Sequence, residues 1–133
     1  MDCIFAQGDG AAEVVYADEC FLRVFDGSTG RVLWVASHSS TTGLEIPAIA
    51  DVDGDGAAEI VQAHNQDLGV LGCVRDATGL AHEGGRSGIT VYGDSRAGWM
   101  PTRRIWNQHS YHIANIREDS AVPRPEPNSW AGP

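Results

Sequence analysis

The sequence contains no lysine, so all nine basic residues are arginines, and 18 acidic residues bring the formal net charge to −9. A chain this acidic repels phosphate groups, which disfavours nucleic acid and anionic membranes as partners and favours divalent cations. No apolar run approaches the roughly 18 residues that a membrane-spanning helix requires. The first residues also lack the basic and apolar segments of a signal peptide. We therefore expect neither nucleic-acid binding nor membrane insertion.

Cysteine is scarce, and the three cysteines are Cys3, Cys20 and Cys73. No pair has the Cys-x-x-Cys spacing of a zinc or redox site, which excludes those sites. Two interpretations stay open: one disulfide with a spare thiol, or three small buried hydrophobic side chains. We favour the second interpretation.

Motifs of catalysis are also missing. The sequence has no Gly-x-Ser-x-Gly nucleophile turn, no phosphate-binding loop and no dinucleotide-binding fingerprint. We therefore expect no catalytic residues and predict that the chain is not an enzyme.

The most informative feature that is present is an internal repeat. The segment GDGAAEVV at residues 8–15 returns as GDGAAEIV at residues 54–61, an offset of 54 − 8 = 46 residues. A period of this length is typical of propellers and solenoids, in which each repeat is one supersecondary unit.

The segments after each copy of the repeat predict β-strands joined by tight turns. Segments rich in β-forming residues are 13–17, 21–25, 31–35, 60–64 and 88–94. Residues 88–94 match the strand at 22–26 of the first copy, and 104–106 match 32–34. The glycine-rich residues 67–87 are an inserted loop by this alignment. One stretch, 102–116, also has apolar positions that one face of a helix would share.

The second copy of the repeat contains the candidate metal site. The sequence DVDGDGAAE at residues 51–59 places carboxylates at its first, third, fifth and ninth positions. Calcium takes several oxygen ligands at about 2.3–2.6 Å, whereas magnesium demands near-ideal octahedral geometry and keeps several waters. Two glycines permit the positive φ angles that a chain needs to curl around an ion. We predict calcium, with side-chain ligands Asp51, Asp53, Asp55 and Glu59 and the backbone carbonyl of Ala57.

This loop resembles that of the FG-GAP or VCBS (integrin-α-like) repeat, Asp-x-Asp-Gly-Asp-Gly-x-x-Asp/Glu, at every required position. The resemblance implies an all-β fold of antiparallel four-stranded β-propeller blades and the same five calcium ligands. It divides the chain into a first blade at 1–46, a second blade at 47–118 and a proline-rich extended tail at 119–133. A propeller closes with about four to eight blades, so two blades imply an incomplete propeller.

The first copy departs from the family pattern. Phe5 and Gln7 stand where the first two aspartates belong, which leaves only Asp9 and Glu13 as carboxylates. We expect this loop to keep its turn without binding metal tightly.

Residues 22–34 are similar to the tryptophan-docking repeat of quinoprotein propellers, Asp-x-x-Thr-Gly-x-x-x-Trp. That resemblance implies that Asp26 and Thr29 stabilise a turn and that Trp34 packs between blades. The motif does not bind the quinone, so we expect no quinone cofactor.

Aromatic and polar residues gather at 99–112. They are either an inter-blade packing segment, which we favour, or a ligand surface in which aromatic rings stack and polar groups donate hydrogen bonds. His109 and His112 are also a candidate metal pair that lacks a third ligand. The candidate ligand-surface residues are Trp99, Arg103, Trp106, Asn107, His109 and Tyr111.

Together these features predict a calcium-binding repeat module of a secreted or cell-surface bacterial-type protein, active in adhesion or in binding a protein or glycan. The expected neighbours are further blades of a parent chain or other copies of this chain. The alternative is the propeller portion of a carbohydrate-active enzyme such as a polysaccharide lyase, and a third, less favoured, is a quinoprotein-like propeller.

Overall fold

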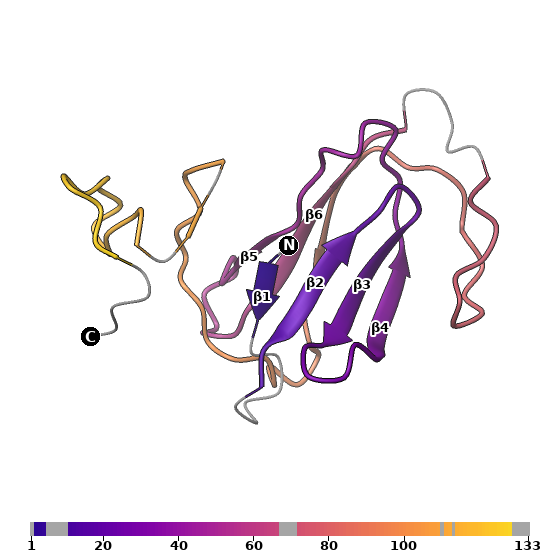
Figure 1. Cartoon of the computed structure of the whole chain (residues 1–133), viewed down its shortest axis with the longest axis horizontal. Helices are drawn as coiled ribbons and strands as arrows, with labels where there is room; N and C mark the ends of the chain where they lie inside the picture. The colour runs from indigo at the N-terminus through magenta and orange to yellow at the C-terminus, as the bar shows by residue number, and fades with distance from the viewer. Residues whose placement is uncertain (1, 5–10, 67–71, 110, 113, 129–133) are drawn as a thin grey trace.

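The computed structural model describes residues 2–4, 11–66, 72–109, 111–112 and 114–128, which form two antiparallel β-sheets (Figure 1). The first sheet has the order β1-β2-β3-β4, and the second has the order β5-β6-β7. The strands of the first sheet are β1 (Asp2–Ile4), β2 (Glu13–Ala17), β3 (Phe21–Asp26) and β4 (Val32–Ser37). Those of the second are β5 (Ala48–Ala50), β6 (Glu59–His64) and β7 (Gly88–Tyr92).

The two copies of the repeat pair their strands in the same register. In the first sheet, Cys3 of β1 lies opposite Val14 of β2, and in the second sheet Ile49 of β5 lies opposite Ile60 of β6. Both residues of the second pair are 46 positions after those of the first. The third strands also agree, because Val15 pairs with Val24 as Val61 pairs with Val91. The sequence repeat is therefore a structural repeat.

The core lies between the two sheets. The first sheet contributes Val15, Leu22 and Val24, and the second contributes Ile49 and Ile60, all of them buried. Figure 1 shows the sheets one behind the other, with β1 next to β5. The aromatic rings of Trp34 and Tyr92 meet edge to face across the sheets, with their centroids 5.0 Å apart. Trp34 thus packs between the two repeats, as the quinoprotein resemblance implied.

The turn between β3 and β4 is built as the same resemblance implied at Asp26. Its carboxylate accepts hydrogen bonds from the backbone amides of Ser28 and Thr29, each at 2.9 Å. The Ser28 hydroxyl adds a third bond at 2.7 Å. These bonds, with the Ser28 hydroxyl as the largest contributor, lower the pKa of Asp26 to about 2. A charged aspartate therefore closes the hairpin at neutral pH.

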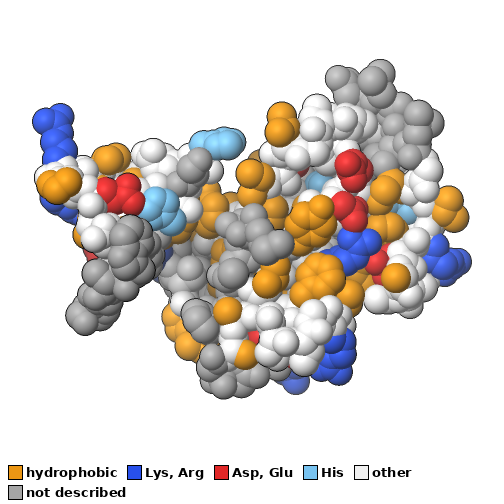
Figure 2. Space-filling model, in the orientation of Figure 1, with side chains coloured by type: hydrophobic (Ala, Val, Ile, Leu, Met, Phe, Trp, Pro, Cys, Tyr) orange, Lys and Arg blue, Asp and Glu red, His pale blue; other side chains and the backbone are white. Residues whose placement is uncertain are grey.

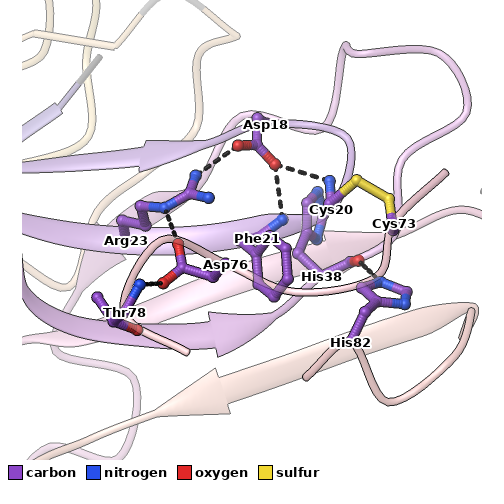
Figure 3. Close-up of polar contacts among 9 residues, drawn as sticks. All are labelled: Asp18, Cys20, Phe21, Arg23, His38, Cys73, Asp76, Thr78 and His82. Atoms are coloured by element: carbon purple, nitrogen blue, oxygen red, sulfur yellow. Dashed lines mark hydrogen bonds and ion pairs between the residues drawn. A yellow bond between two sulfur atoms is a disulfide. The ribbon is translucent and has the colours of Figure 1, made fainter. Parts of the chain in front are cut away.

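The insertion between β6 and β7 is tied to the first sheet, as Figure 3 shows. A disulfide joins Cys20, just before β3, to Cys73. Arg23 of β3 pairs with Asp18 and, at 2.8 Å, with the buried Asp76 of the insertion. The ring of His82 meets Phe21 edge to face. The loop is therefore part of the packed structure, and its first residues, 67–71, lie outside the described part of the chain.

Several expectations are wrong. The cysteines are not all isolated hydrophobic side chains, since Cys20 and Cys73 are bonded. The second sheet has three strands, not four, because residues 104–106 form no strand beside β7. Residues 102–116 show no helix where the structure describes them.

Among the described residues, no helix is long and apolar enough to cross a membrane.

Candidate metal site

The predicted calcium loop connects β5 to β6 and gathers three carboxylates. Oxygen atoms of Asp51, Asp53 and Glu59 all lie within 4.8 Å of one another. Ala50, the last residue of β5, pairs with Glu59, the first residue of β6, and Asp51 directly follows Ala50. The sheet therefore brings together the two ends of the loop, and both of these end carboxylates are buried, at 6% and 7% exposure.

Backbone amides hold the loop in its curled shape. The Asp51 carboxylate accepts from the Gly54 amide at 2.6 Å, and the Glu59 carboxylate accepts from the Val52 amide at 2.9 Å. Gly54 and Gly56 have φ angles of 86° and 93°, in the left-handed region predicted for them. These hydrogen bonds and glycines within residues 51–59 therefore favour the curled shape of the loop.

Asp55 lies outside the cluster of three. Its carboxylate accepts a hydrogen bond from the Ala57 amide at 2.7 Å and caps the end of the loop. Ala57 itself is buried at 7% exposure. The structure therefore brings together three of the four predicted carboxylate ligands, and it does not by itself assign the roles of Asp55 and the Ala57 carbonyl.

A positive charge from a distant part of the chain already contacts this loop. Nε of Arg104 lies 3.1 Å from Asp51, and its Nη2 donates to the Gly54 carbonyl at 2.8 Å. A Cβ at position 54 would come within 2.3 Å of the Arg104 guanidinium, so only glycine leaves room for this contact. Burial alone would raise the pKa of Asp51, but hydrogen bonds from Arg104 and from the Gly54 amide hold it below its usual value.

Sequence reasoning did not connect Arg104 to the metal loop. The two are 53 residues apart, and no local pattern marks an arginine as the partner of a particular carboxylate. The backbone also contributes, because the Asp51 amide donates to the Arg103 carbonyl at 3.2 Å. The corresponding loop of the first repeat, residues 5–10, lies outside the described residues, so its weak metal binding stays a prediction.

The aromatic segment at 99–112 is mostly engaged in packing and pairing. Trp99 and Trp106 are partly buried against the core between the sheets. Arg103 pairs with Glu118 at 3.0 Å and donates to the Tyr111 hydroxyl at 3.1 Å. The rings of Trp106 and Tyr111 lie 4.6 Å apart between centroids. The described part of the segment therefore ties the tail to the sheets.

One hollow does open beside this segment. It has a volume of about 570 Å³ and lies among the residues before β5, one residue of β6 and the aromatic segment. Its lining includes Trp106, Asn107 and His109 from the aromatic segment, and Leu44, Ile46 and Ala63. His112 lies apart from this group and pairs with Glu126 at 3.1 Å. Among the described residues, the histidines at 109 and 112 join no group of three metal-ligand side chains.

Comparisons with known proteins give one structural relative. The chain resembles the V. cholerae biofilm matrix protein Bap1, with a TM-score of 0.72 and 28% sequence identity. The match covers 97% of this chain and 20% of that one, so this chain spans about a fifth of the length of Bap1. No family model and no curated protein matches the sequence. By fold, then, this all-β chain is similar to a part of a bacterial biofilm matrix protein.

Proposed function

We propose that the chain is a calcium-binding β-propeller repeat module of a secreted or cell-surface protein, acting in adhesion or in binding a protein or glycan. The observation that carries this proposal is the cluster of Asp51, Asp53 and Glu59 at the turn between β5 and β6. The module is proposed to bind and to carry no catalytic residues.

The donor set fits a hard cation. Calcium prefers oxygen ligands at about 2.3–2.6 Å, and ligands on opposite sides of one ion are then up to about 5 Å apart. The 4.8 Å spread of the three carboxylates falls within that limit. Asp51, Asp53 and Glu59 would hold the ion, and the Ala57 carbonyl and Asp55 would complete its coordination after a local adjustment. The ion would fix the turn that leads into β6.

An extracellular, adhesive role has two supports. The disulfide between Cys20 and Cys73 is typical of oxidising compartments. The structural relative is a biofilm matrix protein. Matched strand registers in the two sheets are also what successive blades of a propeller require.

The proposed ligand surface is the hollow lined by Trp106, Asn107 and His109. An indole face stacks on a sugar ring or packs on an apolar side chain, and the amide and imidazole supply hydrogen bonds. The cavity volume of about 570 Å³ is in the range of small-molecule sites.

Thermal melts in calcium, in magnesium and in chelator test the metal proposal. Binding at a hundredfold excess over Kd stabilises the fold by about 2.7 kcal/mol, which raises the Tm of a chain this size by several degrees. Asp53→Asn should abolish the calcium-specific rise, whereas Asp119→Asn, outside the loop, should keep it. Equal melts in calcium and chelator for the unaltered chain would refute the calcium site.

Binding to an immobilised panel of glycans and matrix proteins tests the ligand surface. Asn107→Ala with His109→Ala should remove binding with little change in Tm, because both residues are exposed and Asn107 contributes a single exposed hydrogen bond, to the Ser120 carbonyl at 3.2 Å. Binding that survives this double change would place the ligand surface elsewhere.

A further inference from the structure

Each sheet has two faces, and the common register makes the faces of the two sheets comparable position by position. We call the valine face the one formed by Val15, Leu22 and Val24 in the first sheet. The equivalent positions in the second sheet are Val61, Ile89 and Val91. The opposite side is the aromatic face, formed by Val14, Tyr16 and Phe25 in the first sheet and by Ile60, Gln62 and Tyr92 in the second.

The interface inside the molecule joins unlike faces. The valine face of the first sheet is buried against the aromatic face of the second, with Val15, Leu22 and Ile60 at 0% exposure. Because unlike faces pack together, the molecule leaves open one face of each kind: the aromatic face of the first sheet and the valine face of the second. Packing of like faces would leave open two faces of the same kind. The packing is therefore head to tail, and it can in principle be repeated.

The unmated valine face of the second sheet is apolar and open. Ile89 is 73% exposed and Val91 is 50% exposed, although β-branched residues in strands usually pack against other side chains. Among the described residues, no segment buries these two side chains.

The unmated aromatic face of the first sheet is also apolar. Val14, Tyr16 and Phe25 line a hollow of about 340 Å³ that reaches the turn at Gly27 and Gly30. Tyr16 is 43% exposed. Figure 2 shows hydrophobic side chains gathered over the first sheet on the side turned to the viewer.

We propose that these two open faces bind each other between copies of this chain, with the valine face of the second sheet packing on the aromatic face of the first sheet of another copy. The inference rests on the proposed repeat architecture, since it continues the interface already present inside the molecule. The docking area is the part of the aromatic face that the insertion leaves open, because Asp76 and His82 already cover Arg23 and Phe21.

Three single substitutions to aspartate test the proposal by light scattering after size exclusion. Ile89→Asp changes the valine face and Tyr16→Asp the aromatic face, while Val122→Asp changes an apolar side chain that is 61% exposed and lies on neither face. The unaltered chain and Val122→Asp should form species heavier than a monomer as concentration rises. Each face variant alone should weaken this self-association by about tenfold or more.

Mixing the two face variants separates head-to-tail binding from like-face binding. Each variant keeps one working face, so an equimolar mixture should form a dimer and nothing larger. A like-face contact would instead leave one of the variants associating by itself and would overturn the proposal. If either aspartate variant fails to melt cooperatively, Ile89→Ser and Tyr16→Ser replace the pair.

A monomeric unaltered chain at every concentration would also overturn the proposal. Running each sample in calcium and in chelator keeps this outcome distinct from failure of the metal site, because the two substituted residues, Ile89 and Tyr16, are not proposed calcium ligands.

Discussion

At the scale of single residues, two buried histidines couple the sheets. Nδ1 of His38, which follows β4, lies 3.1 Å from Nδ1 of His64 at the end of β6. His38 is fully buried and His64 is 5% exposed. Burial, together with the neighbouring His64, lowers the pKa of His38 to about 4. Burial, together with the positive charge of Arg86, also lowers the pKa of His64. Both rings are therefore neutral at pH 7.

This pair predicts a loss of stability in mild acid. The unfolded chain takes up protons near the ordinary histidine pKa of 6.5, whereas folded His38 does so only near about 4. The stabilisation is complete above pH 6.5 and is lost as the pH falls toward 4, by about 3 kcal/mol. Chemical denaturation across this interval measures the change. His38→Gln should flatten the profile, because it removes the buried group whose lowered pKa produces the loss. A level profile for the unaltered chain would contradict the assignment.

Arg104 predicts competition at the metal loop. Its guanidinium neutralises Asp51 from a position that is 65% exposed, so the pair contributes only a fraction of a kcal/mol to about 1 kcal/mol. Arg104→Gln should therefore raise calcium affinity by up to about fivefold, which isothermal titration would measure. Arg117→Gln, an exposed arginine outside the loop, is the matched control. Weaker calcium binding in Arg104→Gln would show that the arginine supports the loop instead of competing for it.

At the scale of elements, the sequence predicted five of the observed strands but was wrong about a fourth strand at the edge of the second sheet. The segments predicted at 13–17, 21–25, 31–35, 60–64 and 88–94 overlap β2, β3, β4, β6 and β7 to within two residues at each end, because alternating β-forming residues and tight turns are local signals. The expected strand at 104–106 is missing. Pro101 cannot donate a ladder hydrogen bond, and the next residues bind the metal loop through the Arg103 carbonyl and the Arg104 side chain.

The insertion depends on its covalent link. A disulfide that spans 53 residues restricts the unfolded chain by about 4 kcal/mol in the chain-entropy account. Reduction should therefore lower the free energy of unfolding by roughly that amount, measured by denaturant titration with and without a phosphine reductant. The double variant Cys20→Ser with Cys73→Ser should be unaffected by the reductant. An unchanged unfolding free energy in the reduced protein would mean that Arg23 and Asp76 alone hold the insertion.

At the scale of the whole molecule, the inter-sheet core is the main source of stability. Leu22 is fully buried, and Leu22→Ala should cost about 2–5 kcal/mol because it leaves a cavity between the sheets. Leu44 is 75% exposed, so the same change there should stay within about 0.5 kcal/mol. Denaturant titration of both variants makes the comparison. Similar losses at the two positions would show that the sheets do not share one core.

The sequence by itself determined the repeat, its strands, the curled loop at 51–59 and the turn at Asp26, because each depends on residues a few positions apart. Only the tertiary structure decided that Arg104 reaches Asp51 and that Cys20 meets Cys73. The contacts of Arg104 with Asp51 and of Cys20 with Cys73 each join residues 53 positions apart. Their geometry comes from the packing of one sheet on the other, and no local pattern records that packing.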